Sequence, residues 1–336
     1  MSTTHESGQE PHNIFKRSVE NIDESWRRLP PWALPVISFW NNMSMEKGPK
    51  FEPPENKNEL FETVLDSIMT AEEYSQIEHE TPYIFELKAG DKELHYFGSR
   101  HSRNPEDELF SKIEQAFNES SPDIVFVEGI SARGDVEKFN EKVKEASREE
   151  IIDHTGEPGF TLKLAVEKGV EWQSPEPSDK DLYDYLQEQG FLKDEIFAWD
   201  VFHILPQYNR QMDKQSFKEY VSRFIESFEK NTNWEEFNYS YEHAIQLGEQ
   251  ILGKKIDVED EPNGTDYIDP IPWEEKKDKQ TVLNRIGEAS SLFRDRKIVN
   301  DIAEALETHK KVFVVYGASH AAMQEPALRK LFEKTQ

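Results

Sequence analysis

Two segments of this chain share one pattern: an apolar run typical of a strand, then a glycine, then a histidine three residues later. They are Leu94–His101 (LHYFGSRH) and Val312–His320 (VFVVYGASH), and they contain the only two G-x-x-H matches in 336 residues. About 0.4 such matches are expected by chance, so the weight of the pattern comes from its repeated position after a strand. Loops at the carboxyl ends of strands in an α/β sheet converge on the ligand-binding edge. The pattern therefore predicts that the two strands are neighbours, or nearly so, and that their histidines meet.

Acidic residues follow two further predicted strands. Glu128 comes directly after the apolar run Asp123–Val127, and Glu176 follows the short run Val170–Gln173. An unpaired carboxylate at the end of a buried strand is costly, so Glu128 requires a cation or hydrogen-bond donors. Because crossovers place sequential strands close together, the strand before Glu128 is expected beside the two G-x-x-H strands. Glu157 stands at a helix start, where capping is its expected role, and is a supporting acid.

The local setting of each histidine suits a binding site. Gly98 is expected to form a tight turn that lets His101 point across the sheet edge, and Gly317 is the corresponding supporting glycine before His320. His320 stands at the start of the last predicted helix, whose dipole disfavours imidazolium and would keep the ring neutral. We expect His101, Glu128 and His320 to converge so that one ion or one water molecule touches all three, roughly 2–3 Å from each ligating atom.

The order of strand and helix patterns predicts an α/β protein with a central mixed β-sheet flanked by helices on both faces. Asn104 is expected to cap the helix that separates the first two parallel strands. A helical insertion should cover the sheet edge and supply the aromatic walls of a pocket. Four parts are predicted: a disordered or loosely packed polar arm and linker at 1–57 with an aromatic strap at 31–41, a first α/β half at 58–178, the helical insertion and loop at 179–280, and a C-terminal α/β half at 281–336.

Charge and composition exclude several functions. The chain has 67 acidic and 40 basic residues, a net charge of −27. Such a surface repels phosphate backbones and anionic lipid, which argues against nucleic-acid and membrane partners. With no cysteine, thiolate metal ligands and thiol nucleophiles are excluded. No signal peptide or membrane span is evident, so a cytoplasmic location is expected, and the oligomeric state stays open.

The motifs at Gly98–His101, Phe126–Glu128 and Gly317–His320 resemble those of the TraB and Tiki superfamily. ChaN-like haem-uptake proteins and erythromycin-esterase-like hydrolases are its more distant relatives. Arg294, in the helix before the last strand, resembles an arginine that these families carry there. The Tiki branch implies a divalent-metal-dependent peptidase built on two histidines and a glutamate, and the esterase branch implies a histidine and a glutamate acting on water without a required metal. The signal, anchor and membrane segments of many members are not seen here, so substrate and location do not carry over.

The leading hypothesis is a hydrolase that cleaves a peptide or ester bond in a small-molecule or peptide substrate. Two nitrogens and one carboxylate oxygen suit Mn, Co, Zn or Fe, with His101, His320 and Glu128 as the ligands. A divalent metal would lower the pKa of water, and Glu128 or Glu176 would move protons. Arg294 would bind a substrate carboxylate, stabilise an oxyanion, or pair structurally with Glu128.

Two alternatives stay open. The first removes the metal: His101 acts as general base, oriented by Glu128, and Arg294 handles negative charge. The second is not enzymatic: a ligand carrier or an acidic interaction protein. In a carrier of the haem-uptake kind Tyr96 and Tyr316 would be the haem ligands, although both stand inside strands, where core packing is the expected role.

Overall fold

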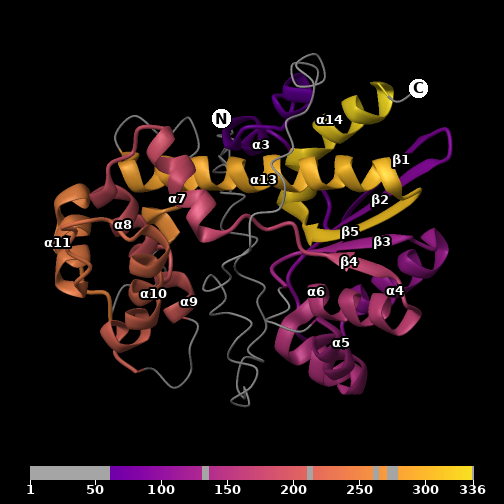
Figure 1. Cartoon of the computed structure of the whole chain (residues 1–336), viewed down its shortest axis with the longest axis horizontal. Helices are drawn as coiled ribbons and strands as arrows, with labels where there is room; N and C mark the ends of the chain where they lie inside the picture. Colours follow the sequence, from indigo (N-terminus) through magenta and orange to yellow (C-terminus); the bar gives the residue numbers. More distant parts are fainter. Residues whose placement is uncertain (1–60, 131–135, 210–214, 260–264, 271–278, 335–336) are drawn as a thin grey trace, which may run out of the picture.

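The architecture is α/β: a five-stranded mixed sheet covered by helices on both faces, with a helical segment beside it (Figure 1). The computed structural model describes residues 61–130, 136–209, 215–259, 265–270 and 279–334. The predicted arm at 1–57, with its aromatic strap, lies outside the described residues. The predicted fold class is confirmed.

The sheet has the strand order β1-β2-β5-β3-β4. Its strands are β1 (Tyr83–Ala89), β2 (Lys92–Ser99), β3 (Ile124–Val127), β4 (Glu171–Gln173) and β5 (Lys311–Gly317). β1 and β2 form an antiparallel hairpin, and the other pairs are parallel. The two G-x-x-H strands, β2 and β5, are direct neighbours, and β3 pairs with the other side of β5, so the predicted adjacency is confirmed. Ser99 is in register with Gly317, and Val127 with Val315, so the three strands end at the same edge.

Apolar side chains on both faces of the sheet form two cores. One face packs under α13 (Val282–Thr308) and α14 (Ala318–Lys334), and the other over α4 (Glu108–Ser120), α5 (Val136–Glu145) and α6 (Arg148–Lys168). Figure 1 shows these two helical layers above and below the strands. A short additional helix, α3 (Ala71–Ser75), contacts α14. In β5 the alternation is strict: Val312, Val314 and Tyr316 enter the first core, and Phe313 and Val315 the second. Burial of each such side chain stabilises the fold by about 1.5–3 kcal/mol.

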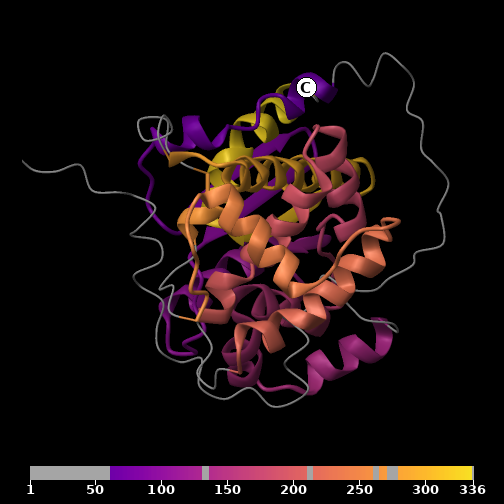
Figure 2. The ribbon, with the colours of Figure 1, turned by 90° about the vertical axis from the view of Figure 1, so that its left-hand side faces the viewer.

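Helix α13 joins the sheet to the helical segment predicted at 179–252. That segment comprises α7 (Asp179–Glu188), α8 (Lys193–Phe202), α9 (Leu205–Asn209), α10 (Phe217–Thr232) and α11 (Tyr241–Leu252), followed by the turn η2 (Thr265–Tyr267). Its aromatic-rich core includes Leu283 and Ile286 of α13, whereas Ile298 and Ile302 of the same helix belong to the sheet core. Figures 1 and 2 show the segment at one end of α13. Within the described ranges no helix is long and apolar enough to cross a membrane.

Helix α4 begins later than predicted. Its N-cap is Asp107, whose carboxylate accepts the Leu109 N–H, whereas Asn104 accepts the Glu106 N–H in a preceding turn. The same Asp107 carboxylate also accepts a hydrogen bond from the Ser102 hydroxyl, 2.8 Å away. Asp107 therefore fixes the loop after β2 as well as the helix start, and the expectation of an Asn104 cap is wrong.

Gly98 is required for packing rather than for a turn. It lies inside β2 and has no positive φ, so the predicted tight-turn role is wrong. A Cβ at this position would lie 2.6 Å from the Ala321 Cβ and 2.7 Å from the Tyr83 carbonyl oxygen. Because α14 begins in direct contact with β2 here, Gly98→Ala should lower the free energy of unfolding by about 1–3 kcal/mol. Urea denaturation measures this change, and an unaltered midpoint would contradict the close approach.

Two aspartates are buried in the helical segment. Asp200 accepts a hydrogen bond from the Tyr183 hydroxyl at 2.6 Å, and Asp179 accepts one from the Asn231 amide at 3.1 Å. Burial raises the pKa of Asp200 to about 7. Burial and then the charge of Asp200 raise the pKa of Asp179 to about 9. The folded chain therefore holds protons at pH values where an exposed aspartate has lost them.

These protons predict a stability that falls with rising pH. Above pH of about 4 the unfolded chain releases the Asp200 proton while the folded chain keeps it to about pH 7, so the free energy of unfolding declines by up to about 1.4 kcal/mol per pH unit. Asp200→Asn should remove that part of the decline. Urea denaturation at pH 5, 6 and 7 tests this, with Glu108→Gln on exposed α4 as the matched control. Equal slopes for the variant and the unmodified chain would contradict it.

Candidate active site

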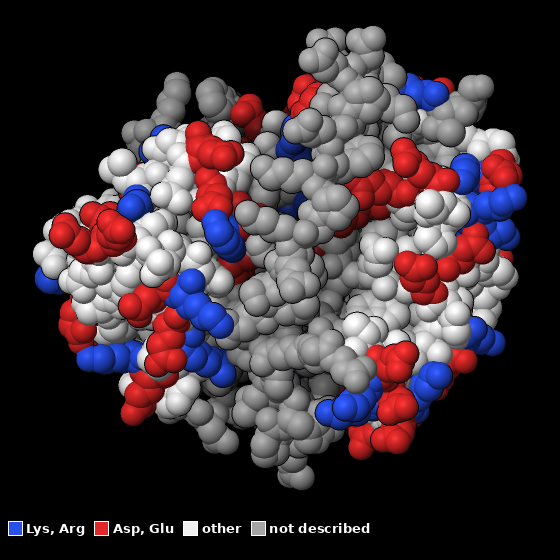
Figure 3. All heavy atoms as spheres, in the orientation of Figure 1, with Lys and Arg blue, Asp and Glu red and all other residues white. Residues whose placement is uncertain are grey.

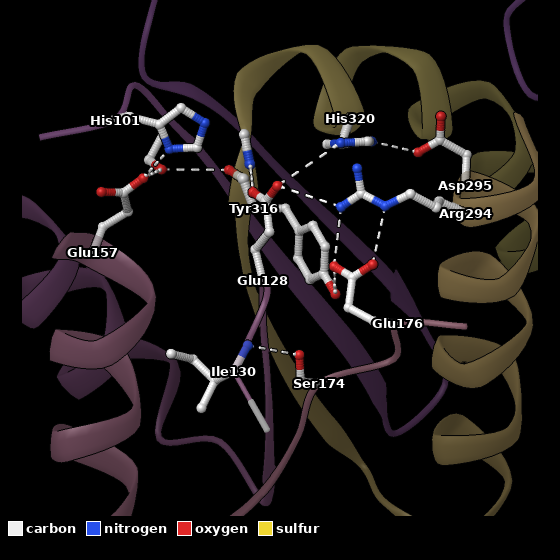
Figure 4. A network of polar contacts seen from close by, with 12 residues as sticks. His101, Glu128, Ile130, Glu157, Ser174, Glu176, Arg294, Asp295, Tyr316 and His320 are labelled. Carbon is white, nitrogen blue, oxygen red and sulfur yellow. Dashed lines mark hydrogen bonds and ion pairs between the residues drawn. The ribbon is translucent and has the colours of Figure 1, made fainter. Parts of the chain in front are cut away.

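The carboxyl ends of β2, β3 and β5 carry the residues that the sequence singled out (Figure 4). A Cβ built on Gly317, the last residue of β5, would lie 3.6 Å from Glu128 Oε2, 3.7 Å from His320 Cδ2 and 3.8 Å from His101 Nε2. Because both atoms lie within 3.8 Å of the same point, His320 Cδ2 and His101 Nε2 are no more than twice that distance apart. The structure therefore brings His101, Glu128 and His320 together around one point beside Gly317.

Glu128 is an ionised carboxylate at the centre of this group. Its Oε2 accepts the Gly317 N–H at 2.9 Å, and its Oε1 lies 3.6 Å from Arg294 Nη2 and 3.9 Å from His320 Nε2. Burial alone would raise the pKa of Glu128. The charges of His320, His101 and Arg294 and the Gly317 amide outweigh burial and lower the pKa to about 2. Glu128 therefore has the cations and the hydrogen-bond donor that a carboxylate at the end of a buried strand requires.

His320 is oriented by a carboxylate that the sequence did not reveal. Its Nδ1 lies 2.6 Å from Oδ1 of Asp295, which is fully buried and also accepts the Gln324 amide N–H at 2.6 Å. Burial and the charge of Arg294 lower the pKa of His320, but Asp295 and Glu128 together outweigh them, so the pKa lies above its ordinary value. The direction is opposite to the one expected from the helix dipole alone, because the carboxylates of Asp295 and Glu128 favour the charged ring. With Nδ1 on Asp295, Nε2 faces Glu128.

His101 is oriented in the same way by Glu157. The His101 Nδ1 lies 2.7 Å from Glu157 Oε1, and the same buried carboxylate accepts the Ser99 hydroxyl and the Ser102 N–H, each at 3.2 Å. Gly156, with a φ of +65°, interrupts α6 so that Glu157 begins its second half at the sheet edge. In the metal-free hypothesis Glu128 was the orienting residue of His101; the structure gives that position to Glu157.

Arg294 and Glu176 form a forked ion pair at the side of the site. Arg294 Nε donates to Glu176 Oε2 at 3.0 Å and Nη2 donates to Oε1 at 3.1 Å, and the Tyr316 hydroxyl lies 3.5 Å from the same Oε1. The two carboxylates, Glu176 and then Glu128, raise the pKa of Arg294 against the effect of burial, so the guanidinium stays charged. Of the roles predicted for Arg294, pairing with Glu128 is the one that the geometry displays; the proton-transfer role of Glu176 stays a prediction.

Sequence reasoning missed Asp295 and Gln324. Asp295 stands three and four residues before the buried Ile298 and Val299, so it lies on the same, core-facing side of α13. An acidic residue at such a position is the sequence feature that could have pointed to a buried carboxylate. Gln324 is also fully buried, and its Oε1 accepts the Tyr96 hydroxyl at 2.8 Å. Tyr96 is thus part of the hydrogen-bonded chain behind His320, as Tyr316 is part of the Arg294 pair. Their assignment as haem ligands stays a prediction.

The donor set suits a divalent metal, although within the described residues no group of three or more His, Cys, Asp or Glu side chains is placed to hold an ion as it stands. Each imidazole has Nδ1 on a buried carboxylate and its opposite edge toward the Gly317 position, which is how metal-binding histidines are held. The network of Figure 4 contains one guanidinium, that of Arg294, and four carboxylates, those of Glu128, Glu157, Glu176 and Asp295. A buried excess of negative charge of this kind favours a bound cation.

The helical segment reaches the site through α13. Tyr185 of α7 stacks on Phe293, the residue before Arg294, with ring centroids 4.4 Å apart. The segment is thereby fixed next to the site's guanidinium. The prediction that its aromatic residues wall a substrate pocket stays a prediction.

The geometry defines a class of site: two carboxylate-oriented histidines and one ionised glutamate at the carboxyl edge of a mixed α/β sheet. Comparisons of the chain with protein-family models, with curated proteins and with solved structures found no match.

Proposed function

We propose that this chain is a hydrolase of the TraB and Tiki type, which cleaves peptide or ester bonds with a divalent metal held by His101, His320 and Glu128. One observation carries the proposal. Both imidazoles have Nδ1 on a buried carboxylate, and both present their opposite edges to the point beside Gly317 that the Glu128 carboxylate also faces. Mn, Co, Zn and Fe all accept such a donor set.

Hydrolysis requires an activated water, a proton acceptor and stabilisation of the negative charge that develops on the substrate oxygen. A divalent cation would supply Lewis acidity at this point. Glu128 is anchored by the Gly317 N–H and stays ionised, so it can bind the cation or accept a proton. Because Glu157 holds Nδ1 of His101, this histidine would present Nε2 to the cation as a ligand, and proton transfer would fall to Glu128 or Glu176.

A metal-free hydrolase is the second candidate, because the His101–Glu157 pair is by itself a base with an orienting carboxylate. In this version Glu157, rather than Glu128, holds the tautomer of His101. Glu128 and Arg294 then shape the charge around the substrate, and His320 is structural. The two candidates differ in whether His320 and a cation are needed.

Chelation and one substitution separate the two candidates. With p-nitrophenyl esters and fluorogenic peptides as substrates, exhaustive EDTA treatment should abolish turnover, and Mn or Co should restore it. His320→Ala should lower kcat/KM at least about 100-fold, because a lost ligand costs more than the 10–100-fold typical of its supporting partners. His243→Ala is the matched control, since His243 pairs with Asp194 in the helical segment. Turnover that survives both chelation and His320→Ala would support the metal-free candidate.

A further inference from the structure

We infer that the site accepts acyl substrates whose acyl chain is neutral or cationic, and discriminates against acyl chains that carry a carboxylate or phosphate. The inference rests on the proposed function and adds the charge class of the substrate. It is carried by the charge balance of the site and by the contacts of its guanidinium.

The polar network carries an excess of negative charge. With both imidazoles neutral, as metal ligation requires, four carboxylates and one guanidinium give it a formal charge of −3, and one divalent cation would bring this to −1; with both imidazoles protonated and no cation the total is also −1. These groups are largely removed from water: the side chains of Glu128 and Glu176 are 18% and 15% exposed, Glu157 is 3% exposed and Asp295 is fully buried. Little solvent screening remains, so an anionic group entering the site meets like charge at short range.

The arginines of the site are engaged with carboxylates. Arg294 donates through both Nε and Nη2 to Glu176, and its Nη2 also faces Glu128, so an anionic substrate would have to displace an existing forked pair. Arg100, in the loop that carries His101, donates to Asp107 at 2.7 Å.

The charge of the whole chain acts in the same direction. The net charge is −27, and Asp and Glu side chains gather on both sides of the face shown in Figure 3. A negative field of this kind raises the local concentration of cationic ligands and lowers that of anionic ones, and salt weakens the effect. Discrimination between substrates should therefore shrink as the ionic strength increases.

A matched substrate series tests the inference on the full chain. The series comprises p-nitrophenyl esters of hexanoic acid (neutral), 6-(trimethylammonio)hexanoic acid (cationic) and adipic acid (anionic). We expect kcat/KM for the neutral and cationic esters to exceed that of the anionic ester at least about tenfold at low salt, and the ratio to fall in 0.5 M NaCl. Binding of the three corresponding N-methyl amides, measured by saturation-transfer NMR, gives the same order without turnover.

Glu176→Gln tests the role of the ion pair. The substitution keeps the size of the side chain, removes one negative charge and weakens the hold on Arg294, so discrimination against the anionic ester should fall about tenfold. Glu108→Gln makes the same change in net charge on exposed α4 and should leave the discrimination unaltered.

The outcomes separate the inference from the proposed function. An anionic ester or amide that is used or bound as well as its neutral partner overturns the inference, whatever the rate. Absence of turnover with the expected order of amide binding overturns the proposed hydrolase and leaves the charge preference standing. Absence of both turnover and binding for every member overturns both.

Discussion

Gly317→Ala is expected to leave the chain folded and to abolish metal binding and hydrolysis together. The new methyl group would stand 3.6–3.8 Å from Glu128, His320 and His101, which is ordinary van der Waals contact, so no neighbour is displaced. It would nevertheless fill the space that the three side chains share. We expect the free energy of unfolding to change by no more than about 1 kcal/mol and kcat/KM to fall at least about 100-fold, because the methyl group would occupy the place of the cation or water on which the three side chains converge.

Gly98→Ala is the matched control, because it places the same methyl group on the other glycine of the doubled motif. There the methyl meets Ala321 and the Tyr83 carbonyl at under 3 Å, so stability should fall. Activity per folded molecule should fall less than in Gly317→Ala, because the new methyl group lies outside the space that His101, Glu128 and His320 share. A Gly317→Ala variant that binds metal and retains turnover would show that the point between the three side chains is not where the chemistry occurs.

Glu128→Gln is expected to lower kcat/KM by about 10²–10⁴, because the variant loses both a ligand charge and a proton acceptor. The amide keeps the shape of the carboxylate, and its oxygen can still accept the Gly317 N–H. The pKa of Glu128 is lowered to about 2, so its ionised form stabilises the fold at neutral pH, and this contribution is lost as pH falls toward 2. The variant should accordingly be less stable than the unmodified chain at pH 7, with a difference that narrows in acid.

Turnover assays at pH 7 and urea denaturation at pH 7 and pH 3 measure these two effects of Glu128→Gln. Glu108→Gln is again the control, since Glu108 is exposed and pairs only with Lys112 one turn along α4 in the described contacts. A fall of less than about tenfold in kcat/KM would remove Glu128 from the reaction, since general acid–base groups contribute more than that.

The sheet and the three central residues could be predicted because they depend on local patterns. Apolar runs that end in Gly98, Glu128 and Gly317 predict buried strands, and parallel strands bring the residues after their carboxyl ends to one edge of the sheet. The start of α4 was misplaced because the choice between Asn104 and Asp107 depends on tertiary contacts of Asp107 with the loop after β2.

The orienting carboxylates could not be predicted in the same way. Glu157 reaches His101 because Gly156 adopts a positive φ that bends α6, and neither the bend nor its direction is fixed by the local sequence. Asp295 is one turn of α13 away from residues that pack on the sheet, and its partner His320 belongs to another helix. The sequence shows that His320 stands at a helix start, where the dipole lowers its pKa, but it does not show that Asp295 lies beside the ring. The pKa of His320 was therefore expected to shift in the wrong direction.

Element analysis of the purified chain tests the central claim most directly. We expect about one equivalent of a divalent transition metal to remain with the unmodified chain after dialysis and reconstitution with Mn, Co, Zn or Fe, as the donor set requires. The His101→Ala/His320→Ala double variant, with an unaltered circular dichroism spectrum, should hold none. Equal metal content in the two proteins, or none in the unmodified chain after reconstitution with each of the four ions, would contradict the claim.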